Sequence, residues 1–323
     1  MVSSTESRSS AGTPADWRSA GLLYHSRSFF FRKQFGQRVW KVSVDAGFGC
    51  PNRDGTCGTG GCIFCDPVSF SPSRRLVRRS VTAQLDEGIR RLRARHRVDR
   101  FVAYFQPATN TYAPVGQLEH VFREALAHRD VAGLMIGTRP DCVPDDVLDL
   151  LAELSRQTWL SVEYGLQTIH DRTLDWMKRG HRYEAFLDAH RRSRQRELTV
   201  GAHVILGLPG ESPADMRATA LQLARLRIDA VKIHNLHAVR DTRLAELVAA
   251  GVVRLPQLAE YVAWVVDLLE YLPPSCVIDR LSGDAPPQYL VGPAWCGDKS
   301  AVRLAVESEL KRRNTWQGRK HAE

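Results

Sequence analysis

Residues 199–225 have the sequence TVGAHVILGLPGESPADMRATALQLAR, and they indicate the fold class. The first eight residues are mostly apolar, which is typical of a strand that is covered on both faces. Gly207 and Gly210 follow as turn residues. Ser212 and Pro213 then supply a capping residue and a first-turn proline for a helix. A strand, a glycine turn and a helix in this order predict one unit of a parallel sheet.

The same order recurs along the chain. Strands are predicted at residues 39–44, 101–105, 133–137, 159–164, 199–206 and 230–234, and helices at residues 81–97, 115–128, 145–154, 183–196 and 213–227. This alternation predicts a parallel α/β sheet with right-handed crossovers. Periodicity leaves open whether the sheet closes into a full or partial (β/α) barrel or stays doubly wound. Both folds place their chemistry at the carboxyl ends of the strands.

The two ends of the chain differ from this pattern. The N-terminal residues are rich in Ser, Thr and Arg, which predicts a flexible lead. Further helices are expected at residues 255–272 and 301–313, around a short apolar run at Val277 and Ile278. The predicted organisation is a lead over residues 1–20, a core over residues 21–240, and a C-terminal extension over residues 241–323 that packs on the core.

Composition limits the class of protein. Of the 323 residues, 43% are hydrophobic and 25% are charged, which excludes collagen-like, disordered and coiled-coil chains. No run approaches the ~18 apolar residues of a membrane span, and the N-terminus has no apolar signal segment. We therefore expect a cytoplasmic protein without a membrane partner. In that reducing compartment, cysteines bind metals or catalyse more often than they form disulfides.

The net charge of +9 permits an anionic partner. Many of the arginines fall in two predicted helices, namely Arg90, Arg91, Arg93, Arg95 and Arg97 in one and Arg191, Arg192, Arg194 and Arg196 in the other. The C-terminal segment adds further cations around Trp316. Such residues form either a solvated surface or a nucleic-acid groove, and charge alone does not decide between them.

A cysteine-rich loop follows the first predicted strand. Residues 50–65 have the sequence CPNRDGTCGTGGCIFC, with four of the seven cysteines and four glycines. This composition predicts a metal-binding loop, in one of two forms. Four cysteines including Cys57 would form a closed zinc site. Three cysteines would hold an iron–sulfur cluster with one open iron, and the position of the loop at the carboxyl end of a strand favours this form.

The spacing Cys50-x11-Cys62-x2-Cys65, with Phe64 before the last cysteine, resembles the cluster loop of radical S-adenosylmethionine (SAM) enzymes. The wide first gap is similar to the branch that contains the radical SAM domain of the Elongator catalytic subunit and an uncharacterised bacterial family related to it. Further phrases similar to that bacterial family are CPNRDG at 50–55, YFQ at 104–106, TNTY at 109–112, GTRPD at 137–141, EYGLQT at 163–168, GLPGE at 207–211 and RRNTWQG at 312–318. The likeness runs from about Leu22 to Arg319.

This resemblance implies a partial (β/α)6 barrel of the TIM type with a helical C-terminal extension. It also implies a 4Fe–4S cluster on Cys50, Cys62 and Cys65, whose fourth iron binds the amino and carboxylate groups of SAM. Reductive cleavage of SAM would yield a 5′-deoxyadenosyl radical that abstracts hydrogen from an unknown substrate. Cys57 would take no part. The electron would come from a one-electron reductant such as flavodoxin or ferredoxin.

Several residues at predicted strand ends are candidates for the SAM pocket. Glu163 lies inside an apolar strand, where a carboxylate needs a partner, and Gln167 follows it. Gly207 lets the backbone approach a flat ring, and Phe64 is expected beside the adenine. Radical SAM enzymes commonly carry a Gly-Gly-Glu turn after the second strand, and this chain has Gln106 and Pro107 there instead. Gln106, or Thr109 beyond it, is expected to replace that contact.

Other polar residues are candidates for contacts with the substrate. Arg139 with Asp141, and Asn235 with His237, follow predicted strands. His203 lies within a strand, either as a hydrogen-bonded core histidine or facing a pocket. Cys142 and Cys276 are expected to be buried apolar residues, and Cys296 is a candidate second thiol.

The sequence supports two functions of different classes. The first is a radical SAM enzyme of unknown substrate, with tRNA as a hypothesis that rests on the likeness to Elongator and on the net charge. The second is a zinc-stabilised nucleic-acid-binding protein without catalysis.

Overall fold

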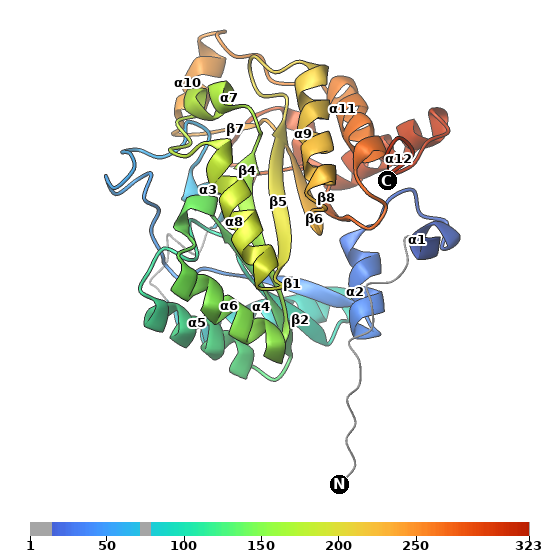
Figure 1. Ribbon diagram of the computed structural model, residues 1–323. Helices are drawn as coiled ribbons and strands as arrows, with labels where there is room; N and C mark the ends of the chain where they lie inside the picture. Colours follow the sequence, from blue (N-terminus) through green and yellow to red (C-terminus); the bar gives the residue numbers. More distant parts are fainter. Residues whose placement is uncertain (1–14, 72–78, 323) are drawn as a thin grey trace.

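Seven parallel strands form the main sheet (Figure 1). They are β1 (Val39–Val44), β2 (Arg100–Phe105), β3 (Val131–Thr138), β4 (Trp159–Gln167), β5 (Thr199–Leu206), β6 (Ala230–Asn235) and β8 (Val277–Arg280), and they pair in this order. The computed structural model describes residues 15–71 and 79–322. The order follows the sequence without reversal, which is the order of a barrel and not of a doubly wound sheet. Within the described residues β1 and β8 do not pair, so the barrel is partial.

Helices surround this sheet (Figure 1). They are α1 (Ala15–Ser19), α2 (Arg27–Phe35), α3 (Pro67–Phe70), α4 (Val81–His96), α5 (Val115–Ala127), α6 (Asp145–Gln157), α7 (Asp171–Trp176), α8 (Tyr183–Gln195), α9 (Pro213–Arg225), α10 (Arg243–Ala249), α11 (Leu258–Tyr271) and α12 (Lys299–Arg312). Among them, α4, α5, α6, α8 and α11 pack directly on the strands of the sheet. The predicted start of α9 is confirmed, since Ser212 and Asp215 form a reciprocal capping box there.

The sheet has one strand more than the six that the sequence predicts. The additional strand is β8, where the apolar run Val277–Ile278 is followed by Asp279 and Arg280. Two apolar residues are too short a pattern to indicate a strand. The strand forms because β6 supplies its hydrogen bonds and because Asp279 finds buried cations, both of which are tertiary contacts. A second, two-stranded sheet pairs β7 (Ala238–Val239) with β9 (Leu290–Gly292).

Most of the predicted N-terminal lead lies outside the described residues. Its described part contains α1, where the buried Trp17 indole donates a hydrogen bond to the carbonyl of Pro274 at 2.9 Å. One apolar core joins strand residues such as Val42 to Leu310 of α12. The boundary predicted at residue 240 stays a prediction, and the core continues across it.

A buried ion pair network connects β8 to the other side of the opening in the barrel. The Asp279 carboxylate accepts hydrogen bonds from Arg27 Nε of α2 and from Lys41 Nζ of β1, both at 2.7 Å. Its side chain is 1% exposed. Burial opposes ionisation, but Lys41 and Arg27 overcome this effect and hold the pKa of Asp279 well below its ordinary value.

We expect Asp279→Asn to lower the free energy of unfolding by about 3–5 kcal/mol, because two partly buried cations lose their counter-charge. The matched control Asp188→Asn removes an exposed carboxylate on α8 and should cost less than about 1 kcal/mol. The measurement is urea unfolding at several pH values. Since folding depresses this pKa, the stabilisation is present above the unfolded pKa of about 3.9 and is lost as the pH falls through the folded value. Equal losses in the two variants would contradict this assignment.

Candidate functional site

A cavity of about 770 Å³ lies at the carboxyl ends of the strands. Residues that end or follow five neighbouring strands line it, including Gln106, Arg139, Gln167, Ile205 and Asn235. The cysteine loop forms one side, and residues between β8 and α12 form another. A cavity therefore lies where the sequence predicts the chemistry. None of the described helices is long and apolar enough to cross a membrane.

Three of the four loop cysteines line this cavity. They are Cys50, Cys62 and Cys65, and each is a free thiol. Cys57 is exposed and does not line the cavity, and its backbone amide instead closes a turn onto the carbonyl of Pro51 at 2.8 Å. Within the described residues, no three His, Cys, Asp or Glu side chains are arranged to hold a single metal ion. The three cysteines form a more open group around the cavity wall.

The Cys62 sulfur accepts from two N–H donors, an environment that would stabilise a thiolate. Asn52 Nδ2 lies 3.4 Å from it and Arg179 Nη1 lies 3.6 Å from it. Arg179 also donates through Nη2 to the carbonyl of Gly165 at 2.7 Å. A Cβ atom at Gly165 would lie 2.6 Å from Nη2, so only glycine leaves room for this guanidinium. Hydrogen bonds to the sulfur and a buried cation both stabilise thiolates bound to a cluster.

A second buried arginine lies behind the first. Arg139 forms a bidentate pair with Asp141, with its shorter contact at 2.7 Å, and donates through Nη1 to the carbonyl of Arg179 at 2.8 Å. Burial opposes this charge, but the hydrogen bonds and charge of Asp141 raise the pKa of Arg139 further above its ordinary value. The loop cysteines are therefore flanked by permanent positive charge. Burial and the nearby Cys62 raise the pKa of the Cys65 thiol to about 12, and a metal cation bound to this sulfur would favour its ionised form.

Four buried polar atoms on cavity-lining residues have no hydrogen-bond partner among the described residues. These atoms are Thr109 Oγ1, Arg179 Nε, His234 Nε2 and Asn235 Nδ2. Burial, with Arg280 and His203 nearby, holds the pKa of His234 well below its ordinary value, so this ring is neutral. Unsatisfied buried polar atoms are costly, and a polar ligand in the cavity would satisfy those that it reaches. The donor set and these atoms fit a thiolate-held cluster with a polar cofactor beside it.

Glu163 lies beneath the floor of the cavity and is 2% exposed. It accepts hydrogen bonds from His203 Nε2 at 2.7 Å and from the Tyr104 hydroxyl at 3.0 Å, and Lys232 Nζ lies 3.6 Å away. Burial opposes its ionisation, but Lys232 and His203 prevail and lower its pKa to about 2. Burial also lowers the pKa of Lys232 to about 8, although Glu163 opposes that shift.

The residues predicted for the SAM pocket fall into two groups. Phe64, Gln106 and Gln167 line the cavity. Glu163 and Gly207 do not line it. A Cβ at Gly207 would lie 3.0 Å from Trp264, so the φ of +84° at this glycine serves packing against α11.

The other candidate polar residues are also located by the structure. His203 donates a hydrogen bond to Glu163 and also lines the cavity. It is therefore both a hydrogen-bonded core histidine and a residue that faces a pocket. Asn235 and His237 line the cavity as well. Cys142, Cys276 and Cys296 are buried.

Two important residues lie outside these predictions. Lys232 is a charged residue inside the apolar strand β6. This pattern is visible in the sequence and indicates a buried charge that needs a partner. Arg179 lies in a connection between α7 and α8, where no pattern indicates its role.

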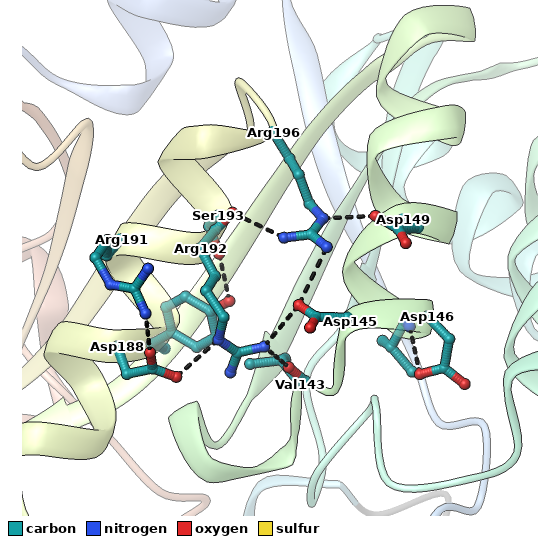
Figure 2. A network of polar contacts seen from close by, with 11 residues as sticks. Val143, Asp145, Asp146, Asp149, Asp188, Arg191, Arg192, Ser193 and Arg196 are labelled. Carbon is teal, nitrogen blue, oxygen red and sulfur yellow. Dashed lines mark hydrogen bonds and ion pairs between the residues drawn. The ribbon is translucent and has the colours of Figure 1, made fainter.

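The arginines at the C-terminal end of α8 point toward aspartates (Figure 2). Asp188 pairs with Arg191 at 2.5 Å and with Arg192 at 2.7 Å. Arg196 reaches Asp149 at 2.6 Å and Asp145 at 3.1 Å, which joins α8 to α6. The structure thus favours a solvated, internally paired surface for this helix.

The cations of the C-terminal segment are paired in the same way. Lys320 pairs with Glu270, and Arg313 pairs with Asp267 at 2.6 Å. Arg18 lies over the ring of Trp316 at 4.1 Å, with Arg319 at 5.1 Å from the same ring. This tryptophan therefore stacks within the protein.

Comparison with known proteins identifies relatives of this chain. The description "Radical SAM superfamily" matches residues 47–223, and "Radical_SAM C-terminal domain" matches residues 228–312. The uncharacterized protein YtqA of Bacillus subtilis is 38% identical over 306 residues, which cover 95% of this chain and 95% of that protein. The tRNA uridine(34) acetyltransferase of Methanocaldococcus jannaschii is 28% identical, over 52% of this chain and 31% of that protein.

Among solved structures, Elp3 of the archaeon Methanocaldococcus infernus shares the fold. It superposes with a TM-score of 0.65 at 19% identity, and the match covers 86% of this chain and 64% of that chain. These relatives leave the alternative of a zinc-stabilised binding protein without support.

Replacing single cysteines tests the ligand set. We expect Cys50→Ala, Cys62→Ala and Cys65→Ala each to lose bound iron, because the predicted cluster needs all three thiolates. Cys57→Ala is the matched control and should retain iron, since its thiol is exposed and lies off the cavity. The measurement is iron and sulfide content with the visible absorption spectrum after anaerobic reconstitution. Loss of iron in the Cys57→Ala variant would show that the ligand set is wrong.

Proposed function

The chain belongs to the radical SAM superfamily, and from this membership we propose that Cys50, Cys62 and Cys65 hold its 4Fe–4S cluster and that its substrate is a tRNA. The superfamily uses this cluster with SAM, so the chain is a radical SAM enzyme. The observation that carries the site assignment is the convergence of these three cysteines on one cavity at the strand ends. When bound, the cluster supplies the electron that cleaves SAM and yields a 5′-deoxyadenosyl radical for hydrogen abstraction.

The residues around the cysteines bind and orient. Asn52 and Arg179 direct N–H groups at the Cys62 sulfur and fix its position. Thr109 and Gln106 lie where the sequence lacks the usual Gly-Gly-Glu turn, and both line the cavity. They offer a hydroxyl and an amide to the polar end of SAM. Phe64 offers an aromatic face to its adenine.

The residues beneath the cavity favour one tautomer of the neutral His203 ring. Glu163 is ionised and can only accept, so His203 Nε2 must carry the proton of their 2.7 Å hydrogen bond. Burial and Lys232 lower the pKa of His203, which makes the neutral ring the dominant form at pH 7. Nδ1 is then an acceptor. This arrangement suits a residue that positions a substrate hydroxyl or N–H group.

Two observations support tRNA as the substrate class. The similarity to the tRNA uridine(34) acetyltransferase covers 52% of this chain. The net charge of +9 favours a polyanionic partner. A one-electron reductant such as flavodoxin or ferredoxin completes the proposed set of partners.

Thr109→Val tests the SAM site without disturbing the fold. The hydroxyl has no partner among the described residues, so its loss should leave the free energy of unfolding unchanged within about 0.5 kcal/mol. The Kd for SAM should rise roughly tenfold, which corresponds to one hydrogen bond of about 1.4 kcal/mol. The measurement is equilibrium binding of SAM to the reconstituted protein. Gln195→Ala on the exposed end of α8 is the control, and an unchanged Kd in Thr109→Val would remove this residue from the pocket.

The substrate class is tested by turnover. The reduced enzyme is incubated with SAM, with and without tRNA, and 5′-deoxyadenosine is quantified alongside the mass of the tRNA nucleosides. We expect tRNA to increase 5′-deoxyadenosine formation at least several-fold and to acquire a new nucleoside mass. Equal formation with and without tRNA, and unchanged nucleosides, would contradict tRNA as the substrate while leaving the radical chemistry intact.

A further inference from the structure

A second cavity, of about 650 Å³, lies at the opening of the partial barrel. It is bounded by α2, the start of β1, β8 and α12, and α2 and α12 lie on the same side of the molecule (Figure 1). Because β1 and β8 do not pair, this is where a closed barrel would have a continuous wall. We call this cavity the seam groove.

The charge of the seam groove is strongly positive. Seven cationic side chains and one carboxylate line it, namely Arg27, Arg32, Arg38, Lys41, Arg280, Lys299 and Arg303 with Asp279. Three carboxylates offset part of this charge, since Asp279 pairs with Arg27 and Lys41, Asp284 with Arg280 and Lys299, and Glu307 with Arg303. Arg32 and Arg38 are exposed, and no ion pair to either is found in the described part of the chain. These two differ from the arginines of α8, whose charge is matched by aspartates (Figure 2).

The seam groove adjoins the cavity that holds the cysteines. Arg280 and Lys299 line both of them. Asp284, which lines the larger cavity, lies between these two cations, 2.8 Å from Lys299 Nζ and 3.4 Å from Arg280 Nη2. A polyanion bound in the groove would therefore meet the active-site cavity at this junction.

An aromatic residue accompanies the cations. Trp40 lines the groove, is half-buried, and stacks on His96 with ring centroids 3.7 Å apart. Cations that follow a backbone, together with an aromatic ring on which a base stacks, are the usual elements of a site for single-stranded nucleic acid. Cations spread over four elements exceed what one free phosphate would need.

We propose that the seam groove binds the ribose–phosphate backbone of the tRNA and directs a single-stranded segment past Arg280 and Lys299 into the active-site cavity. This inference rests on the proposed tRNA substrate. It goes further in assigning the surface that binds the RNA and the side of the barrel by which the RNA enters. The same geometry assigns no RNA contact to the arginines of α8.

The test is tRNA binding by the reconstituted full chain as a function of salt concentration. We expect the double variant Arg32→Ser, Arg38→Ser to raise the Kd for tRNA at least tenfold at 0.1 M salt. The slope of log K against log salt should fall by roughly 1.5, because two phosphate contacts are lost. The matched control Arg129→Ser, Arg225→Ser removes two exposed arginines that do not line the groove. It should change the Kd for tRNA less than twofold, and both double variants should bind SAM as the wild type does.

The possible results distinguish a failure of the seam groove as the binding surface from a failure of tRNA as the substrate. Tight tRNA binding by the wild type, with equal losses or none in both double variants, would overturn the groove and leave the tRNA substrate standing. No binding of tRNA by the wild type at low salt would overturn the substrate and the groove together. Groove-dependent binding to vesicles containing phosphatidylglycerol, without binding to tRNA, would likewise overturn the proposal in favour of a membrane surface.

Discussion

Buried charges that must neutralise one another organise both cavities of this protein. Lys232 Nζ lies 3.6 Å from Glu163 and 3.9 Å from Asp279, so one ammonium serves two carboxylates inside the barrel. Each group would be costly to bury alone. Asp279 lines the seam groove, and Lys232 lines the cavity with the cysteines. The polar floor of the active site and the wall of the groove are thus parts of one network.

This network joins the two edges of the sheet where the barrel stays open between β1 and β8. Lys41 of β1 and Asp279 of β8 meet through a side-chain ion pair, where a closed barrel would have backbone hydrogen bonds between its first and last strands. Two side chains reach further than the spacing between hydrogen-bonded strands. The ion pair can therefore connect the edges of β1 and β8 without backbone pairing between them. The opening remains lined with charged side chains, among them Arg38 and Arg280.

The parts of this structure that sequence could predict are those with local patterns. The sequence predicts the six longer strands because their apolar runs and glycine turns recur. The cysteine spacing likewise indicates the loop that lines the cavity. The sequence does not predict β8, because Asp279 and Arg280 interrupt its pattern, and the strand depends on tertiary contacts with β6 and with the cations around Asp279. Glu163 was correctly expected to need a partner, but its partners Tyr104, His203 and Lys232 come from three other strands. Sequence shows that a buried charge needs compensation, whereas the fold determines which residue provides it.

The distribution of charge also changes how the excess of cations is interpreted. The net charge of +9 and the arginine-rich helices permit an anionic partner. However, Arg191 and Arg192 on α8 and Arg196 directly after it are matched by aspartates. Paired surface charges contribute little field at a distance, because each cation is screened by its own anion. Arg32 and Arg38 do contribute, since no described acid pairs with them and they border a concave surface that concentrates the potential. Attraction of a polyanion therefore depends on where unmatched cations border a concave surface, and the seam groove, which adjoins the cavity with the cysteines, is one such place in the described part of the chain.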